Sequence, residues 1–206
     1  MSEAVPVVFV VDDDISVRES LEELIIVEGW KAKIFDSAEA FLSHPREAVP
    51  SCLILDVNLP KLNGLDVQKL VAPDRIEMPI IFITGYGDVP TTVQAMKAGA
   101  VEFLTKPFSD EVLLAAIRDA IDRSSSAIDG EHEMQQLRDC YSSLSNRERE
   151  VMALVTSGLM NKQIGGKLGI SETTVKAHRG RVMRKMKVDS LADLVTLNAK
   201  LGLATS

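Results

Sequence analysis

The segment Leu53-Ile-Leu-Asp56-Val-Asn-Leu-Pro60 ends an apolar run with one carboxylate, at the point where a proline turns the chain. The four apolar or small residues from Cys52 to Leu55 are typical of a strand buried in a parallel sheet. Asp56 would then lie at the carboxyl end of this strand, the edge at which open α/β sheets bind ligands. An isolated aspartate is also a common turn residue, so its role depends on what the other strands place beside it.

Segments with strand character recur along the first half of the chain, and stretches with helical spacing of apolar residues separate them. Five strands that alternate with five helices predict a doubly wound α/β domain. The four further strands are expected at Val7–Val11, Lys31–Phe35, Pro79–Thr84 and Val101–Leu104.

Polar groups stand at the ends of four of these strands: Asp12 and Asp13, then Asp56, Thr84 and Lys106. If the strands are parallel, these side chains meet at one rim. Neighbouring carboxylates repel each other by about 4 kcal/mol at 4 Å and an effective dielectric near 20, so the site favours a cation. Oxygen ligands at an exposed rim suit Mg²⁺ (or Mn²⁺). One carboxylate could then attack a phosphoryl group, whose oxygens Thr84 and Lys106 would hold.

Four motifs follow one another along residues 1–123: Val-Val-Asp12-Asp13-Asp14, Leu-Asp56-Val-Asn-Leu-Pro60, Ile-Thr84-Gly-Tyr-Gly-Asp and Phe-Leu-Thr-Lys106-Pro107-Phe. As an ordered set they resemble the receiver domain of two-component response regulators of the NarL/FixJ family. The resemblance implies a flavodoxin-like or CheY-like fold with a parallel five-stranded sheet. It also implies that Asp56 accepts a phosphoryl group from a sensor histidine kinase.

The same resemblance assigns roles to the residues around Asp56. Mg²⁺ would be held by Asp56 itself, by Asp13 directly, by Asp12 through water and by the backbone carbonyl of Asn58. Thr84 and Phe103 match the pair that moves on phosphorylation, and Lys106-Pro107 matches a position where the family has a cis peptide bond. Phosphorylation is expected to produce a homodimer through roughly Val89 to Phe103.

The charge distribution predicts a second module behind the receiver. Residues 143–206 carry eleven Lys and Arg against five Asp and Glu, a net charge of +6, whereas the remaining residues carry 12 against 25, a net charge of -13. A basic rear module can face a polyanion. Between the two, Ser124-Ser-Ser and Gly130 favour a weakly structured stretch over Asp122–Gly130, followed by a short polar helix over Glu131–Tyr141. The expected boundaries are 1–123 for the receiver, 124–142 for a partly helical linker and 143–206 for the rear domain.

The rear domain is predicted to be all-α, with four helices that include a helix-turn-helix. Ser145-Asn-Arg-Glu148 is a capping box that opens the first helix. A second helix is expected over Asn161–Leu168, with a turn at Gly169, a third helix capped by Ser171, and a fourth around Leu191–Leu197.

Three segments of this domain, Leu-Ser-Asn-Arg-Glu-Arg-Glu-Val, Gly-Leu-Met-Asn-Lys-Gln-Ile and Ile-Ser-Glu-Thr-Thr-Val-Lys-Ala-His-Arg, resemble the LuxR-type DNA-binding domain over Leu144–Leu203. One departure is Gly165-Gly166 inside the second helix. Each glycine costs about 1 kcal/mol relative to alanine, so this helix is expected to be less rigid. The resemblance places Lys176 and Ala177 near bases, with Thr173, Thr174, Arg179 and Arg181 as contacts to phosphates or bases.

The sequence as a whole predicts a cytoplasmic DNA-binding response regulator that is a phosphoacceptor and not a turnover enzyme. It contains no apolar run long enough to span a bilayer and no signal peptide pattern, so no membrane partner is expected. The expected partners are a sensor histidine kinase, promoter DNA, RNA polymerase and a second copy of the chain. Two alternatives remain open: a binding module that uses the receiver only as a dimer scaffold, and a catalytic phosphatase fused to a basic domain.

Overall fold

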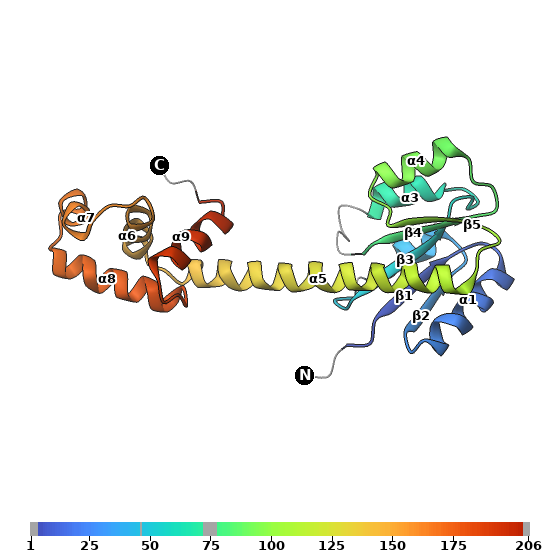
Figure 1. Ribbon diagram of the computed structural model, residues 1–206, viewed down its shortest axis with the longest axis horizontal. Helices are drawn as coiled ribbons and strands as arrows, with labels where there is room; N and C mark the ends of the chain where they lie inside the picture. The colour runs from blue at the N-terminus through green and yellow to red at the C-terminus, as the bar shows by residue number, and fades with distance from the viewer. Residues whose placement is uncertain (1–3, 46, 72–77, 204–206) are drawn as a thin grey trace. The chain divides into compact units, whose positions relative to one another are not determined.

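The computed structural model describes residues 4–45, 47–71 and 78–203. The chain forms two compact units, Met1–Asp129 and Gly130–Ser206, shown together in Figure 1. Each unit has its own hydrophobic core, and each is described separately below.

Unit 1 contains a five-stranded, entirely parallel sheet with the strand order β2-β1-β3-β4-β5. This arrangement confirms the doubly wound α/β prediction. The strands are β1 Val7–Val11, β2 Lys31–Phe35, β3 Ser51–Asp56, β4 Ile80–Thr84 and β5 Glu102–Thr105. The helices are α1 Ile15–Val27, α2 Ala38–Leu42, α3 Gly64–Val71, α4 Val89–Lys97 and the first part of α5 Asp110–Ser142.

Two layers of helices cover the sheet, which explains why its central strands are almost uninterrupted apolar runs. Along β1, Val7, Phe9 and Val11 face the layer of α2, α3 and α4, whereas Val8 and Val10 face α1 and α5. Because the strands are parallel and covered on both faces, their carboxyl ends all reach one rim of the sheet, where polar side chains can meet solvent.

Unit 2 is built from the later part of α5 and four helices, in agreement with the predicted all-α domain. The four are α6 Asn146–Thr156, α7 Asn161–Leu168, α8 Glu172–Lys185 and α9 Leu191–Lys200. The predicted stop and start signals appear in the structure. Ser145 and Glu148 form a capping box at α6, and Gly169 ends α7 with a left-handed φ of 67°. The Ser171 side chain caps α8.

The stretch expected to be weakly structured is helical instead. Helix α5 runs without interruption from Asp110 to Ser142, so the short helix expected over Glu131–Tyr141 is its second half. The hydroxyls of two serines in this stretch have hydrogen-bond partners within the folded unit. Ser124 is only 1% exposed, and its hydroxyl accepts a hydrogen bond from the backbone N–H of Ser51 at 3.0 Å. The Ser126 hydroxyl donates back to the carbonyl of Asp122.

Within residues 4–45, 47–71 and 78–203, no helix has both the length and the apolar composition that a membrane-spanning segment requires.

Candidate functional site

Three carboxylates come together at the rim where the strands of unit 1 end. Asp12 follows β1, Asp13 is the next residue, and Asp56 is the last residue of β3. One carboxylate oxygen from each lies within 4.8 Å of the others. Asp12 and Asp56 are buried and Asp13 is exposed, so the group forms an acidic pocket with one open side. This donor set of carboxylate oxygens fits a hard divalent cation such as Mg²⁺.

Lys106, which follows β5, supplies the positive charge of this pocket. Its Nζ donates to Asp12 Oδ2 at 2.6 Å and lies 3.8 Å from Asp56 Oδ1. Asp12 itself is fixed from the other side, because its Oδ1 accepts from the backbone N–H of Asp14 at 2.9 Å. The peptide bond between Lys106 and Pro107 is cis, as the family resemblance implied. The two distances place the lysine amine beside both buried aspartates.

Asp56 has a buried carboxylate oxygen, Oδ1, without a hydrogen-bond partner among the described residues. Burial raises the pKa of Asp56, and the charges of Asp12 and Asp13 add to this effect, whereas Lys106 and the backbone N–H of Asn58 oppose it. Burial of a polar oxygen without a hydrogen bond lowers the free energy of unfolding of the protein. Such an oxygen is available to a cation or to a covalent partner.

Thr84, the last residue of β4, is fully buried and its hydroxyl has three partners. Asn58 Nδ2 donates to Thr84 Oγ1 at 3.0 Å, and the backbone N–H of Tyr86 donates to it at 3.2 Å. The hydroxyl in turn donates to the carbonyl of Tyr86 at 3.3 Å. The side chain of Asn58 thus connects the loop after β3 to the end of β4. Phe103 is half-buried on β5, with its ring 6.1 Å from that of Phe82.

Two glycines lie in close contact with the residues of this site, although their sequence context indicated only turns and loops. A Cβ on Gly64 would lie 2.5 Å from the carbonyl oxygen of Asp56. A Cβ on Gly87 would lie 2.6 Å from Thr105 Cγ2 and 3.3 Å from the Phe103 ring. The neighbour of Gly64 is a backbone atom that cannot move aside, so this position needs glycine. At Gly87 the nearest atom is a side-chain methyl, so the Thr105 side chain would have to shift to admit a Cβ. Only the folded chain reveals what each glycine approaches.

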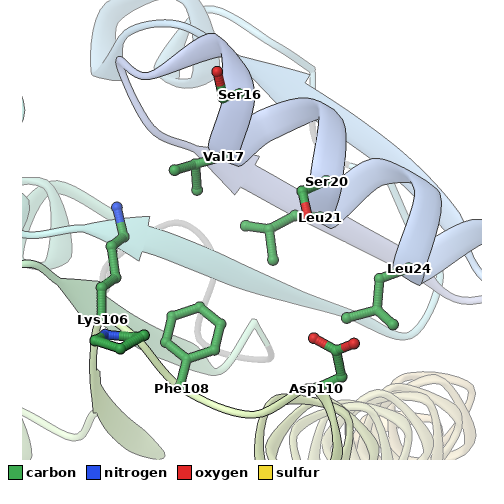
Figure 2. A pocket seen from close by; sticks show the side chains of 9 residues that line it. Ser16, Val17, Ser20, Leu21, Leu24, Lys106, Phe108 and Asp110 are labelled. Carbon is green, nitrogen blue, oxygen red and sulfur yellow. The ribbon is translucent and has the colours of Figure 1, made fainter.

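A cavity of about 370 Å³ borders the acidic pocket. Figure 2 shows it between α1 and the segment that follows β5, with Lys106 and Phe108 facing Val17 and Leu21 of α1. Lys106 thus has its methylene chain in the wall of the cavity while its amine binds Asp12.

In unit 2, the exposed face of α8 carries most of the residues predicted to contact DNA. The buried face of this helix consists of Val175 and Val182, with Met186 just beyond its end. Arg179 is half-buried, and its Nη1 donates to Asn161 Oδ1 of α7 at 3.4 Å. The other five predicted contact residues are exposed: Thr173, Thr174, Lys176, Ala177 and Arg181.

An ion pair fixes the carboxyl end of α8. Lys185 Nζ binds Glu148 Oε2 at 2.7 Å and the carbonyl of Ser143 at 2.9 Å. Glu148 also accepts from the backbone N–H of Ser145 at 2.9 Å, as its place in the capping box requires. The hydrogen bond from Lys185 is the main reason why the pKa of Glu148 falls to about 2. The sequence indicated the cap but not the lysine, which is 37 residues away.

The two glycines of α7 differ in what a side chain at each position would meet. Gly165 is buried, and a Cβ there would lie 2.7 Å from the carbonyl oxygen of Ile170. The N–H of Ile170 also donates to the carbonyl of Gly165 at 3.0 Å. Gly165 therefore permits the tight turn between α7 and α8. Gly166 faces open space, so only its cost in helix propensity applies.

Comparison with known proteins covers both units. Residues 8–118 match the family described as response regulator receiver domain, and residues 142–198 match the luxR family of bacterial regulatory proteins. Nodulation protein W of Bradyrhizobium diazoefficiens is 48% identical over 200 residues, which are 97% of this chain and 88% of that protein. Transcriptional regulatory protein FixJ of the same organism is 40% identical over 196 residues, 95% of this chain and 96% of that protein. The solved structure of response regulator StyR has a TM-score of 0.86 and 47% identity, and the match covers 96% of this chain and all of that one.

Proposed function

The chain belongs to the two-component response regulators that join a receiver domain to a LuxR-type DNA-binding domain, and we propose that phosphorylation of Asp56 by a sensor histidine kinase controls its binding to promoter DNA. One observation carries this proposal. The buried Oδ1 of Asp56 has no hydrogen-bond partner among the described residues, yet it lies 3.8 Å from the amine of Lys106 and close to two further carboxylates.

In the proposed reaction, a carboxylate oxygen of Asp56 forms a bond to the phosphorus of a phosphohistidine on the kinase. The bond between phosphorus and the imidazole nitrogen breaks, and the nitrogen keeps the electron pair. The product is an acyl phosphate on Asp56. Lys106 would donate to the phosphoryl oxygens, a role supported by its amine lying 2.6 Å from Asp12 Oδ2 and 3.8 Å from Asp56 Oδ1.

The acidic pocket is the proposed Mg²⁺ site. Asp12, Asp13, Asp56 and the backbone carbonyl of Asn58 would hold the ion, or Mn²⁺ in its place. The bound ion would neutralise the carboxylates and the phosphoryl oxygens, which otherwise repel each other. The clustered oxygens and the unpartnered Oδ1 of Asp56 support this assignment.

Thr84 and Phe103 are the proposed switch residues, and α4 with β5 is the proposed surface for a homodimer. Three apolar side chains of α4, Val89, Val93 and Met96, are exposed in the single chain. Burial of these side chains against a second copy would favour association. Two linked DNA-binding domains would then bind a two-fold site more tightly than one, through effective concentration.

For the DNA-binding unit, we propose that the exposed face of α8 enters the major groove. Lys176 and Ala177 would lie near base edges, and Thr173, Thr174 and the two arginines Arg179 and Arg181 would contact phosphates or bases. RNA polymerase is the proposed further partner, because a regulator bound at a promoter acts on transcription through it.

The receiver is proposed to accept one phosphoryl group per chain and not to act as a turnover phosphatase. The test is incubation of the full chain with acetyl phosphate and Mg²⁺, followed by intact-mass measurement. We expect up to one added phosphoryl group on the wild type, none on Asp56→Asn, and wild-type labelling of the control Asp66→Asn, whose carboxylate is exposed on α3. Stoichiometric labelling of Asp56→Asn would eliminate Asp56 as the acceptor, and release of many equivalents of phosphate from small esters would favour the phosphatase.

A further inference from the structure

The hydroxyl of Thr84 uses its full hydrogen-bonding capacity in this structure. A hydroxyl has one hydrogen to donate and two lone pairs that accept. Thr84 Oγ1 donates to the carbonyl of Tyr86 and accepts from the N–H of Tyr86 and from Asn58 Nδ2. The side chain is fully buried. Thr84 cannot donate to a phosphoryl group on Asp56 until it gives up bonds that it already makes.

The bond from Asn58 differs from the two bonds to Tyr86. Tyr86 lies in the loop that directly follows β4, two residues beyond Thr84, so its backbone groups can move with Thr84. Asn58 lies on the loop after β3, and its amide reaches across to the end of β4 at 3.0 Å. The bond therefore joins the loop that carries the phosphoacceptor to the residue that must respond to it.

We infer that the side chain of Asn58 is a positioning residue that holds Thr84 in the unphosphorylated arrangement and so sets the threshold for activation. This inference rests on the proposed function, because it requires a phosphoryl group on Asp56 that competes for the Thr84 hydroxyl. When that hydroxyl turns toward the phosphoryl group, the amide of Asn58 loses its acceptor. Asn58 is exposed, so water can then satisfy its amide.

The proposed role of the Asn58 side chain is separable from that of its backbone. The carbonyl that is assigned to Mg²⁺ remains in any substitution, whereas Asn58→Leu removes the amide and keeps the branching and the number of heavy atoms of the side chain. Asn63→Leu is a matched control. Asn63 is an exposed asparagine on the same loop whose side chain accepts from the N–H of Leu65 at 2.9 Å, and that bond does not involve Thr84.

The experiment measures the dissociation constant of beryllofluoride, a phosphoryl analogue that bonds to a carboxylate, on the full chain with saturating Mg²⁺, by isothermal titration calorimetry. One neutral hydrogen bond corresponds to about a two- to tenfold change in an equilibrium constant. We expect Asn58→Leu to bind the analogue more tightly by that factor and Asn63→Leu to match the wild type. The dissociation constant for Mg²⁺ alone should stay the same in all three proteins.

A double-mutant cycle distinguishes release of Thr84 from a general structural effect. In the background of Thr84→Ala, the hydroxyl is absent, so adding Asn58→Leu should change the affinity for the analogue by less than about twofold. Equal or weaker binding by both Asn58→Leu and Asn58→Ala would overturn the inference, as would the same gain in the Thr84→Ala background. Asn58→Ala is the second variant, with the same expected result if leucine disturbs the loop. A wild type that binds no analogue at all would overturn the phosphoacceptor assignment, and the inference with it.

Discussion

Asp56 and Glu148 are both buried carboxylates, one in each unit, but their pKa values shift in opposite directions. Burial raises the pKa of Asp56, and one of its oxygens has no hydrogen-bond partner within the described residues. Lys185 and the Ser145 backbone lower the pKa of Glu148 to about 2. The receiver thus contains a buried carboxylate with an unsatisfied oxygen, at the position of the proposed phosphoacceptor. The DNA-binding unit satisfies its buried carboxylate and uses it to hold helices together.

The two regions also differ in how their functional side chains are assembled. At the rim of the sheet, Asp12, Asp56, Thr84 and Lys106 come from four different strands or strand ends and contact one another directly or through a shared neighbour. On α8, the proposed DNA contacts fall between Thr173 and Arg181 along one helix and are mostly exposed. Substitutions at the rim should therefore be coupled, whereas substitutions on α8 should act almost independently.

The largest expected effect follows from Glu148→Ala. This change removes a helix cap and a charged hydrogen bond, so the free energy of unfolding of unit 2 should fall by about 3 kcal/mol. Hydrogen exchange in urea should show the loss in the amides of α6 to α9 and not in β1 to β5. The control is Glu150→Ala, which removes only an exposed ion pair with Arg147 and should cost less than about 1 kcal/mol.

The pH dependence of the stability of unit 2 gives a second test of the ion pair between Glu148 and Lys185. The pKa of Glu148 is lowered from 4.5 to about 2, so its contribution to stability is present above pH 4.5 and is lost as the pH falls toward 2. In Glu148→Ala this part of the acid sensitivity of unit 2 should be absent. An unchanged acid transition in that variant would contradict the assigned role of the pair.

The next effect separates the two glycines of α7. Gly165→Ala places a methyl group against the carbonyl of Ile170 and should destabilise unit 2 by about 2 kcal/mol, even after the gain in helix propensity. In Gly166→Ala the new methyl group points into open space, so the change should stabilise unit 2 by up to about 1 kcal/mol. Thermal unfolding of the two variants provides the comparison. Equal changes of the same sign would show that the turn after α7 does not depend on the close approach at Gly165.

The smallest effect is a stabilisation of unit 1, because it removes one of the charges that repel each other in the acidic pocket. In metal-free protein at pH 7, Asp56→Asn should stabilise unit 1 by about 1 kcal/mol, since it removes a buried charge with an unsatisfied oxygen. The pKa of Asp56 is raised from 3.8, so the wild type gains stability as the pH falls and loses it as the pH rises through the raised value. The advantage of asparagine should therefore vanish below about pH 4. A variant less stable than the wild type at pH 7 without metal would contradict this view of the pocket.

The sequence predicted the five strands because strands buried in a parallel sheet are apolar runs. The ends of these runs showed that Asp12, Asp56 and Lys106 lie at the carboxyl ends of strands. It predicted the four rear helices because caps such as Ser145 and Ser171 are local signals. It was wrong about Asp122–Gly130, which was expected to be weakly structured and is part of helix α5. The composition around Ser124 indicates a break, whereas the partner that satisfies its hydroxyl lies on β3 and depends on the fold.

The residues that the sequence analysis missed also depend on contacts that form only in the folded chain. Gly64, Gly87 and Gly165 stand in contexts that are typical of turns, loops or weak helices, and only the packed chain shows what each approaches. The partner of Glu148 and the contact between Asn58 and Thr84 are likewise long-range. Arg179 was predicted to contact DNA from its place in the motif, but it is half-buried and its side chain hydrogen-bonds to Asn161 of α7.

The link between Asp56 and DNA binding is tested most directly by the affinity of the full chain for a DNA fragment selected from a random pool. Fluorescence anisotropy at fixed salt would give the dissociation constant before and after acetyl phosphate and Mg²⁺. Labelling would be checked by intact mass in the same samples. We predict that phosphorylation tightens binding by the wild type at least about tenfold, within the usual range of coupling between sites, and leaves Asp56→Asn unchanged. Equal affinity of the labelled and unlabelled wild type would contradict control of DNA binding by Asp56.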